Sequence, residues 1–207
     1  MMKPFWEQFF EESVHRIFQP GARILDIGAG LRIDASRGNR EDPARAWIKP
    51  LLAGVTYRVL DPVPTYHPDI VGDVMSLPLP DASEDAIICL AVLEHVSRPW
   101  DAMREMHRVL KPGGCLFLYV PFLSPYHALE GYYGDYFRFT EDGLRSLCGE
   151  FESVKIAAVS GPVETLANLV PGRQKFLRRI GRWIDGVRLG SGKQVSGYYL
   201  LAQKSSS

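Results

Sequence analysis

The sequence carries no net charge, because its 24 lysine and arginine residues are matched by 24 aspartate and glutamate residues. This balance argues against a broad basic surface for coating nucleic acid, so we expect no nucleic-acid partner. The sequence also lacks an apolar run long enough to span a bilayer. Its first residues, MMKPFWEQFF, lack the pattern of a secretory signal. Together these absences predict a cytoplasmic protein.

Cysteine is scarce, and the three residues present are Cys89, Cys115 and Cys148. They fall inside expected strands or a helix and lack metal-ligand spacing, which favours buried thiols. No group of His, Asp and Glu residues has a convincing ligand spacing either. The sequence therefore predicts no metal site.

The 207 residues, 46% of them hydrophobic, are enough for one domain with a substantial core. Apolar runs bounded by turn residues alternate with amphipathic stretches. The expected strands cover about residues 22–27, 55–60, 70–71, 86–92, 115–120, 151–159 and 198–203, and the expected helices about 4–18, 43–52, 100–110 and 140–149. This alternation predicts an α/β protein with a parallel sheet and helices on both faces.

Two of the expected strands stop at an acidic residue. The first, RILDI, contains Asp26 and is followed by Gly28 and Gly30, and the second, YRVL, is followed by Asp61. Because glycine lacks a Cβ, the backbone of such a turn can approach a ligand closely. The pattern suggests a nucleoside site whose cationic and hydroxyl groups lie near the two carboxylates.

Four blocks of sequence, in this order, resemble the class I S-adenosylmethionine-dependent methyltransferases of the type 11 small-molecule group. They are ILDIGAG, VLDP, GDVMSLPLPDASEDAIICLAVLEHV and AMREMHRVLKPGGCLFLYVP. The resemblance implies a Rossmann-like seven-stranded sheet, mostly parallel, with strand seven antiparallel. It also implies a single domain over 1–207, made of an N-terminal helix (1–20), a cofactor-binding core (22–121), a substrate loop (122–140) and an insertion (160–194).

The resemblance further implies S-adenosylmethionine as the cofactor and S-adenosylhomocysteine as its product. The residues that it assigns to the cofactor are Asp26, Gly28, Gly30, Asp61, Asp73, Val74, Met75, Leu90 and Ala91. Asp61 can accept hydrogen bonds from ribose hydroxyls, and Asp73 would meet the adenine amine. Each of these acids also has a simpler interpretation, as a turn cap or as a solvated side chain.

Two other interpretations stay open. A nicotinamide dehydrogenase would show G-x-G-x-x-G with an acid about 20 residues on, whereas here the last glycine is missing and Asp61 lies 33 residues after Gly28. The family often has a third glycine where this chain has Arg32. Arg32 could reach the cofactor carboxylate, or the turn could be wider than usual. A catalytically inactive cofactor-binding relative is therefore the second alternative.

The loop at 122–140 is dense in aromatic residues, and the family usually builds its acceptor site there. The candidate substrate contacts are Tyr126, His127, Tyr133, Tyr136 and Arg138. Histidine titrates near neutral pH and suits a general base, so His127 is the first catalytic candidate and His95 the second. The loop could instead pack as a lid, and Glu94 and His95 could cap the next helix.

The insertion contains an apolar stripe at helical spacing in residues 173–188, with six basic residues against one acid. Such a helix could cover the substrate pocket, lie on an anionic membrane or form a dimer contact, so a monomer and a homodimer both stay open. The predicted function is methyl transfer to an oxygen or nitrogen atom of a small organic acceptor. Methylation of a lipid or quinone at a membrane surface is the alternative.

Overall fold

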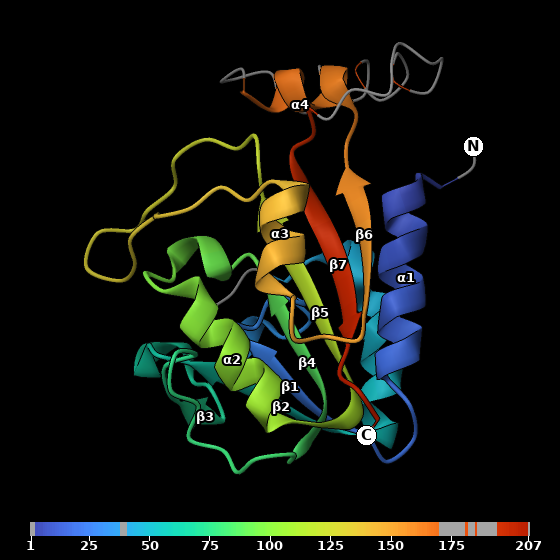
Figure 1. Ribbon diagram of the computed structural model, residues 1–207, viewed down its shortest axis with the longest axis vertical. Helices are drawn as coiled ribbons and strands as arrows, with labels where there is room; N and C mark the ends of the chain where they lie inside the picture. The colour runs from blue at the N-terminus through green and yellow to red at the C-terminus, as the bar shows by residue number, and fades with distance from the viewer. Residues whose placement is uncertain (1–2, 38–40, 170–180, 182–184, 186–193, 207) are drawn as a thin grey trace.

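The computed structural model describes residues 3–37, 41–169, 181, 185 and 194–206. Seven strands form one sheet in the order β3-β2-β1-β4-β5-β7-β6 (Figure 1). β7 runs antiparallel to both β5 and β6, whereas the other neighbouring pairs are parallel. The predicted fold class is confirmed, including the antiparallel seventh strand.

The bounds of the elements follow the predicted order along the chain. The strands are β1 (Arg23–Ile27), β2 (Thr56–Asp61), β3 (Ile70–Val71), β4 (Glu84–Leu90), β5 (Leu110–Pro121), β6 (Ser153–Val159) and β7 (Gly197–Gln203). The α-helices are α1 (Phe5–Ile17), α2 (Pro99–Val109), α3 (Glu141–Leu147) and α4 (Pro162–Leu169). Short 3₁₀ helices are η1 (Ala35–Arg37), η2 (Pro43–Gly54), η3 (Pro64–Tyr66) and η4 (Leu93–His95).

Each face of the sheet carries its own apolar core. On β4, Ile87 and Cys89 pack with α2 and α3, whereas Ala86, Ile88 and Leu90 pack with α1 and η2. This division follows from the strand, in which successive side chains point to opposite faces. Because both faces are covered by helices, the interior of the central strands is mostly apolar, with Asp26 on β1 and Glu84 on β4 as buried acidic exceptions.

Two local details differ from the sequence-based expectation. The helix expected at 43–52 is a 3₁₀ helix that contains Pro50, a residue without the N–H group that an α-helix needs there. β5 begins at Leu110, five residues before the strand expected at 115–120, and so includes Gly113 and Gly114. A Cβ on Gly114 would lie 2.9 Å from the carbonyl oxygen of Lys111, so the irregular start of this strand requires glycine.

The insertion is described only in part. Its α4 begins beside Asp185, whose carboxylate accepts hydrogen bonds from the N–H groups of Val163 (3.1 Å) and Glu164 (2.9 Å). Apart from Gly181 and Asp185, the predicted basic helix 173–188 lies outside the described residues. Among the described helices, none is both long and apolar enough to cross a membrane.

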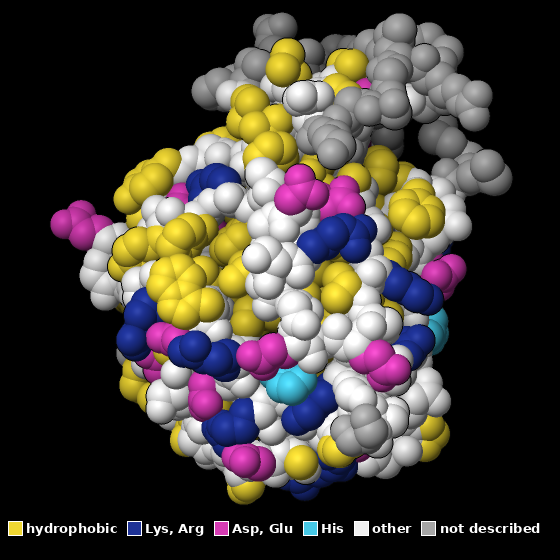
Figure 2. Space-filling view, in the orientation of Figure 1, with side chains coloured by type: hydrophobic (Ala, Val, Ile, Leu, Met, Phe, Trp, Pro, Cys, Tyr) yellow, Lys and Arg dark blue, Asp and Glu magenta, His cyan; other side chains and the backbone are white. Residues whose placement is uncertain are grey.

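Charged side chains of both signs lie interspersed on the described face of the molecule in Figure 2. Acidic and basic groups often sit beside one another there, with apolar side chains exposed between them. This distribution is the spatial counterpart of the balanced composition, in which 24 basic residues match 24 acidic ones.

Candidate functional site at the carboxyl ends of the strands

The acid of β1 organises the turn that follows it. The carboxylate of Asp26 is fully buried and accepts hydrogen bonds from the N–H groups of Gly30 (3.1 Å) and Leu31 (3.2 Å). The hydroxyl of Tyr57, on the neighbouring β2, donates a third hydrogen bond at 2.5 Å. Burial raises the pKa of Asp26 to about 6 even with these donors present. Asp26 therefore shapes the turn, in line with the turn-cap interpretation, and any effect on the cofactor stays a prediction.

The two glycines let this turn lie directly against the end of β4. A Cβ on Gly30 would be 2.7 Å from the Cβ of Leu90, and a Cβ on Gly28 would be 2.7 Å from Cγ2 of Val92. Gly28 also has φ +76°, a conformation that side-chain-bearing residues rarely adopt. The structure thus brings together four of the predicted cofactor residues, Gly28, Gly30, Leu90 and Ala91, at adjacent strand ends.

Arg32 takes the backbone conformation that favours glycine. Its φ is +53°, and its N–H group donates to the carbonyl of Ala29 at 3.1 Å. The turn is therefore closed by a short-range hydrogen bond, and the wider turn considered from the sequence is not observed. The Arg32 side chain is exposed.

Arg45 supports the same turn, and sequence reasoning did not identify it. Its Nη1 donates to the carbonyl of Gly30 at 2.7 Å, while its guanidinium lies 4.9 Å from the ring centroid of Phe10. Arg45 comes from η2, and no spacing in the sequence ties that helix to the turn. Tyr57 was missed for the same reason, since its partner Asp26 lies on another strand.

Asp61 closes β2 at the same edge of the sheet. Its Oδ1 accepts a hydrogen bond from the N–H group of Val63 at 2.8 Å, and its side chain is half-buried. Among the described residues, this is the one hydrogen bond of the Asp61 side chain. Burial raises the pKa of Asp61. Oδ2 is therefore available to a ligand hydroxyl at the end of the strand.

The predicted adenine contact forms a small turn after β3. Asp73 is exposed, and its Oδ1 accepts a hydrogen bond from the N–H group of Met75 at 2.8 Å. Val74 is buried, whereas Met75 is half-buried against the core. The turn presents one carboxylate and an apolar side chain beside β2, and its contact with adenine stays a prediction.

After β4 the chain turns sharply into η4. Ala91 has φ +57°, and its N–H group donates to the carbonyl of Tyr119 at 2.9 Å. Glu94 and His95 follow within η4. The idea that these two residues cap the next helix is wrong, because α2 begins at Pro99 and no side chain caps its first turn.

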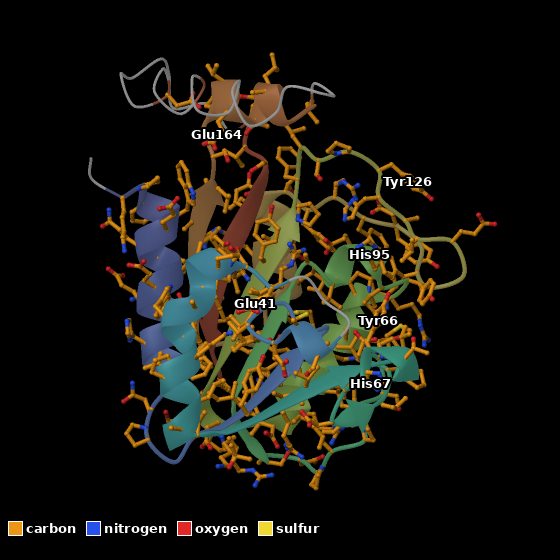
Figure 3. The ribbon with its side chains drawn as sticks, turned by 180° about the vertical axis from the view of Figure 1, so that it is seen from behind. Glu41, Tyr66, His67, His95, Tyr126 and Glu164 are labelled. Carbon is orange, nitrogen blue, oxygen red and sulfur yellow. The ribbon has the colours of Figure 1, made fainter. Side chains whose placement is uncertain are left out.

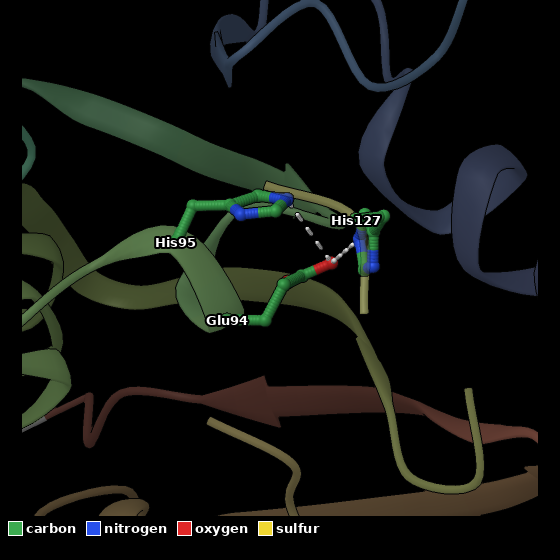
Figure 4. A group of neighbouring side chains, drawn as sticks. All are labelled: Glu94, His95 and His127. Carbon is green, nitrogen blue, oxygen red and sulfur yellow. Dashed lines mark ion pairs between the residues drawn. The ribbon is translucent and has the colours of Figure 1, made fainter. Parts of the chain in front are cut away.

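The loop after β5 returns over this turn and places His127 beside Glu94 and His95. Oε1 of Glu94 lies 3.7 Å from Nε2 of His127 and 3.9 Å from Nε2 of His95 (Figure 4). The two imidazole centroids are 4.8 Å apart, and the ring of Tyr133 lies 4.3 Å from that of His95. Burial raises the pKa of Glu94 to about 7 and lowers the pKa of His95. Both catalytic candidates thus share one site.

Arg138 fixes the shape of the loop. Its guanidinium donates to both carboxylate oxygens of Asp135 and to the carbonyls of Ser124, Pro125 and Phe137. The hydrogen bonds from Arg138 hold the pKa of Asp135 well below its usual range. The structure gives Arg138 a positioning role, and its contact with an acceptor stays a prediction.

Two of the aromatic candidates, Tyr126 and Tyr136, are more exposed than His127. Tyr126 is 76% exposed and Tyr136 is 57% exposed. Tyr132 stacks on Tyr66, the last residue of η3, with ring centroids 5.9 Å apart, so the loops after β2 and β5 meet. Figure 3 shows Tyr66, His95 and Tyr126 on the same side of the molecule. The lid interpretation and the substrate-contact interpretation are compatible with this arrangement.

A hollow of about 490 Å³ lies at the opposite edge of the sheet, near the amino ends of β1, β4 and β5. Its polar side chains are paired with one another, as in the 2.7 Å contacts between Lys111 and Asp85 and between Arg16 and Gln203. Ligands of open α/β sheets bind at the carboxyl ends of the strands. We therefore place the candidate site at the Asp26–Asp61 edge.

Comparison with known proteins finds methyltransferases over part of the chain. Residues 52–118 match the family model described as a methyltransferase domain, the type 11 model. This match and the methyltransferase relatives below support a class I S-adenosylmethionine-dependent methyltransferase of the type 11 group. The resemblance carried by the four sequence blocks is confirmed, and S-adenosylmethionine is the cofactor of this family.

Two curated methyltransferases illustrate the relationship. The chain is 33% identical over 115 residues to a demethylmenaquinone methyltransferase of Renibacterium salmoninarum, which covers 54% of this chain and 45% of the relative. It is 32% identical over 102 residues to a ubiquinone biosynthesis O-methyltransferase of Pseudomonas aeruginosa, covering 47% of this chain and 44% of the relative. The chain spans about half the length of these relatives.

Solved methyltransferases share the fold at low identity. An S-adenosylmethionine-dependent methyltransferase from Archaeoglobus fulgidus superposes with a TM-score of 0.57 at 17% identity, covering 97% of this chain and 100% of that one. A phosphoethanolamine N-methyltransferase from Haemonchus contortus, solved with S-adenosylmethionine, gives 0.54 at 14% identity, covering 97% of this chain and 53% of that one.

The residues at the Asp26–Asp61 edge fit the family's cofactor. The half-buried carboxylate of Asp61 has one hydrogen bond in the described part of the chain, so it retains acceptor capacity for ribose hydroxyls. Gly28 and Gly30 lack the Cβ atoms that would collide with Val92 and Leu90, so the turn packs closely against the end of β4. The free acceptor capacity of Asp61 is the feature that fits a nucleoside, whereas contact of the glycine turn with the cofactor stays a prediction.

Proposed function

We propose that this methyltransferase transfers the methyl group of S-adenosylmethionine to an oxygen or nitrogen atom of a small organic acceptor. One arrangement supports the proposal most: the glycine turn, Asp61 and the His95–His127 pair follow strands that end at one edge of the sheet. When bound, the cofactor supplies an electrophilic methyl group on a sulfonium and leaves as the neutral thioether S-adenosylhomocysteine. Positioning by the protein can then contribute much of the rate.

The chain's own residues have three tasks in this reaction. Gly28, Gly30 and Asp61 hold the nucleoside and its methionine portion, whereas the loop anchored by Arg138 excludes water. His127 is the first candidate to accept the proton of the acceptor, and His95 is the second. Burial lowers the pKa of His95, so its imidazole is neutral near pH 7 and can take up a proton.

A screen for methyl transfer tests this function. The protein is incubated with S-adenosylmethionine and fractionated pools of small metabolites, and release of S-adenosylhomocysteine is measured. We expect release with a subset of pools, and a His127→Ala variant with lower turnover between about pH 6 and 9. Cofactor binding without release from any pool would favour the inactive relative. Unchanged turnover in the variant would remove His127 as the base.

A lipid or quinone acceptor at a membrane surface is the second candidate. The names of the menaquinone and ubiquinone relatives favour it, as does the basic character of residues 173–188. Sedimentation with anionic vesicles at physiological salt separates the two candidates. Co-sedimentation that high salt reverses would support the membrane-surface acceptor, and a protein that stays in the supernatant would end this alternative.

A further inference from the structure

Three side chains with metal-binding atoms converge at the turn after β4. One ligand atom from each of Glu94, His95 and His127 lies within 4.8 Å of the other two (Figure 4). Glu94 and His95 come from η4, and His127 comes from the loop after β5. The sequence-based prediction of no metal site overlooked this group, because only the fold brings His127 to the other two.

The outer contacts orient both imidazoles toward Glu94. Nδ1 of His95 lies 2.6 Å from the carbonyl oxygen of Gly134. Nδ1 of His127 lies 3.0 Å from the carbonyl oxygen of Pro125 and 3.4 Å from Oδ2 of Asp135. Both Nδ1 atoms therefore face acceptors and carry the proton of the neutral ring, which leaves each Nε2 with a lone pair. Metal-binding histidines typically have such partners on the other ring nitrogen.

Two charged groups near His127 do not alter this assignment. Nη2 of Arg138, which can only donate, lies 3.5 Å from Nδ1 of His127, farther than either acceptor. The guanidinium is also bound to both carboxylate oxygens of Asp135. The charge of Arg138 is thus largely balanced by Asp135 rather than by Glu94.

Glu94 provides an independent sign that this arrangement can hold a cation. Its side chain is only 1% exposed, and its Oε2 has no hydrogen-bond partner among the described residues. A buried carboxylate oxygen without a partner costs free energy, which a bound cation or a proton removes. Its backbone carbonyl accepts hydrogen bonds from Tyr136 (2.7 Å) and Phe137 (3.3 Å), so the loop holds the residue in place.

We propose that Glu94, His95 and His127 bind a divalent transition-metal cation of the Zn²⁺ type. Two imidazoles and one carboxylate suit such a cation, whereas Mg²⁺ and Ca²⁺ prefer oxygen ligands alone. Ligand bonds of about 2.0–2.2 Å to a tetrahedral ion place the donor atoms about 3.4 Å apart. The two separations from Glu94, 3.7 Å and 3.9 Å, need to contract by a few tenths of an ångström. The separation between the two histidine ligand atoms is within 4.8 Å and requires a larger movement of His127. His127 is 41% exposed and lies on a loop that can adjust.

The role of the cation rests on the proposed function. Three protein ligands leave a coordination position open in the turn after β4, a few residues along the chain from the candidate cofactor contacts Leu90 and Ala91. An acceptor hydroxyl bound there loses its proton to solvent as it binds, before the loop excludes water, and its oxygen then forms a bond to the methyl carbon. The carbon–sulfur bond breaks, and its electron pair stays on sulfur. With the cation bound, both Nε2 lone pairs are in use, so the histidines act as ligands and no longer as the proton acceptors considered above. The favoured acceptor atom is then oxygen.

Metal binding to the purified full chain tests the site without requiring activity. The protein is treated with a chelator, dialysed and titrated with Zn²⁺ by calorimetry, and with Co²⁺ by visible absorption. We expect one cation per chain. The affinity for Zn²⁺ should fall at least about 100-fold in His127→Ala and in Glu94→Gln. Mutating a residue that only hydrogen-bonds to a metal ligand already lowers metal affinity about 10–100-fold. His107→Ala is the matched control, because His107 pairs with Glu150 at 3.6 Å outside the group.

The result that overturns the inference is the absence of one-to-one binding, or an equal loss of affinity in His107→Ala and His127→Ala. His127→Ala keeps the Arg138–Asp135 pair and is expected to fold, which circular dichroism checks. Titration of the same metal-free protein with S-adenosylhomocysteine keeps the two proposals separate. Nucleoside binding without metal binding overturns the cation site and leaves the proposed function standing, whereas metal binding without nucleoside binding supports only the cation site.

Discussion

The hydroxyl of Tyr57 on β2 donates a 2.5 Å hydrogen bond to the fully buried carboxylate of Asp26 on β1. This contact ties the glycine turn to the neighbouring strand. Removing it in Tyr57→Phe should lower the free energy of unfolding by about 2 kcal/mol at pH 8, where Asp26 is ionised, since the bond is to a charged group. Chemical denaturation measures the change. Tyr132→Phe, an exposed tyrosine of the aromatic loop, is the control and should be neutral.

The raised pKa of Asp26 also makes the free energy of unfolding depend on pH. Its pKa is about 6 in the folded protein, against 3.8 for the free side chain, so the folded state holds the proton more tightly. The stabilisation from this group is complete below pH 3.8 and is lost as pH rises through 6. The free energy of unfolding of the wild type, relative to Asp26→Asn, should fall by about 3 kcal/mol between those limits. A flat or rising difference would contradict the account.

Gly30 is required by the close approach of two strand ends. In Gly30→Ala the new Cβ would meet the backbone oxygen of Leu90 at 2.8 Å, and neither strand can move away freely. We expect a loss of about 1–3 kcal/mol in stability, the usual cost of overpacking, together with weaker binding of S-adenosylhomocysteine. Gly54→Ala is the control, because a Cβ added there would have no neighbour within 4 Å and the φ of Gly54 is not in the left-handed region. Equal effects in both variants would disprove the requirement.

The Arg32→Gly variant distinguishes the cost of backbone strain from a contribution to ligand binding. A residue with a side chain pays a conformational cost at φ +53°, so Arg32→Gly should raise the free energy of unfolding or leave it unchanged, within about 1 kcal/mol. If the guanidinium contacts the cofactor carboxylate, the same variant should bind S-adenosylhomocysteine more weakly. Thermal unfolding and calorimetry measure the two effects separately. A clear loss of stability would show that the Arg32 side chain supports the turn.

The sheet could be predicted from the sequence because its signals are local. Apolar runs that stop at Asp26 and Asp61, and the glycines after the first run, mark strand ends within a few residues of sequence. Thr140 is a further example: it was expected to begin a helix, and its hydroxyl accepts a hydrogen bond from the N–H group of Gly143 at 3.1 Å.

The rest of the site depends on contacts between distant segments, which spacing cannot show. The approach of His127 to Glu94 depends on how the loop after β5 folds back, and that path is fixed by Arg138 and Asp135. The partnership of Tyr57 with Asp26 depends on the parallel register of β1 and β2. Arg138 was predicted to contact substrate as one of the polar and aromatic side chains of the loop, and that contact stays a prediction. The sequence did not show that its guanidinium also binds Asp135 and the carbonyl of Pro125.

Asp61 offers the most direct test of the nucleoside site. Calorimetric titration with S-adenosylhomocysteine compares the wild type, Asp61→Asn and Asp81→Asn, the last removing an exposed carboxylate that pairs with Arg108. Loss of hydrogen bonds to a charged acceptor should weaken binding about 10- to 100-fold in Asp61→Asn, while Asp81→Asn matches the wild type. No measurable binding to the wild type, or equal affinity in all three proteins, would contradict a nucleoside site at this edge of the sheet.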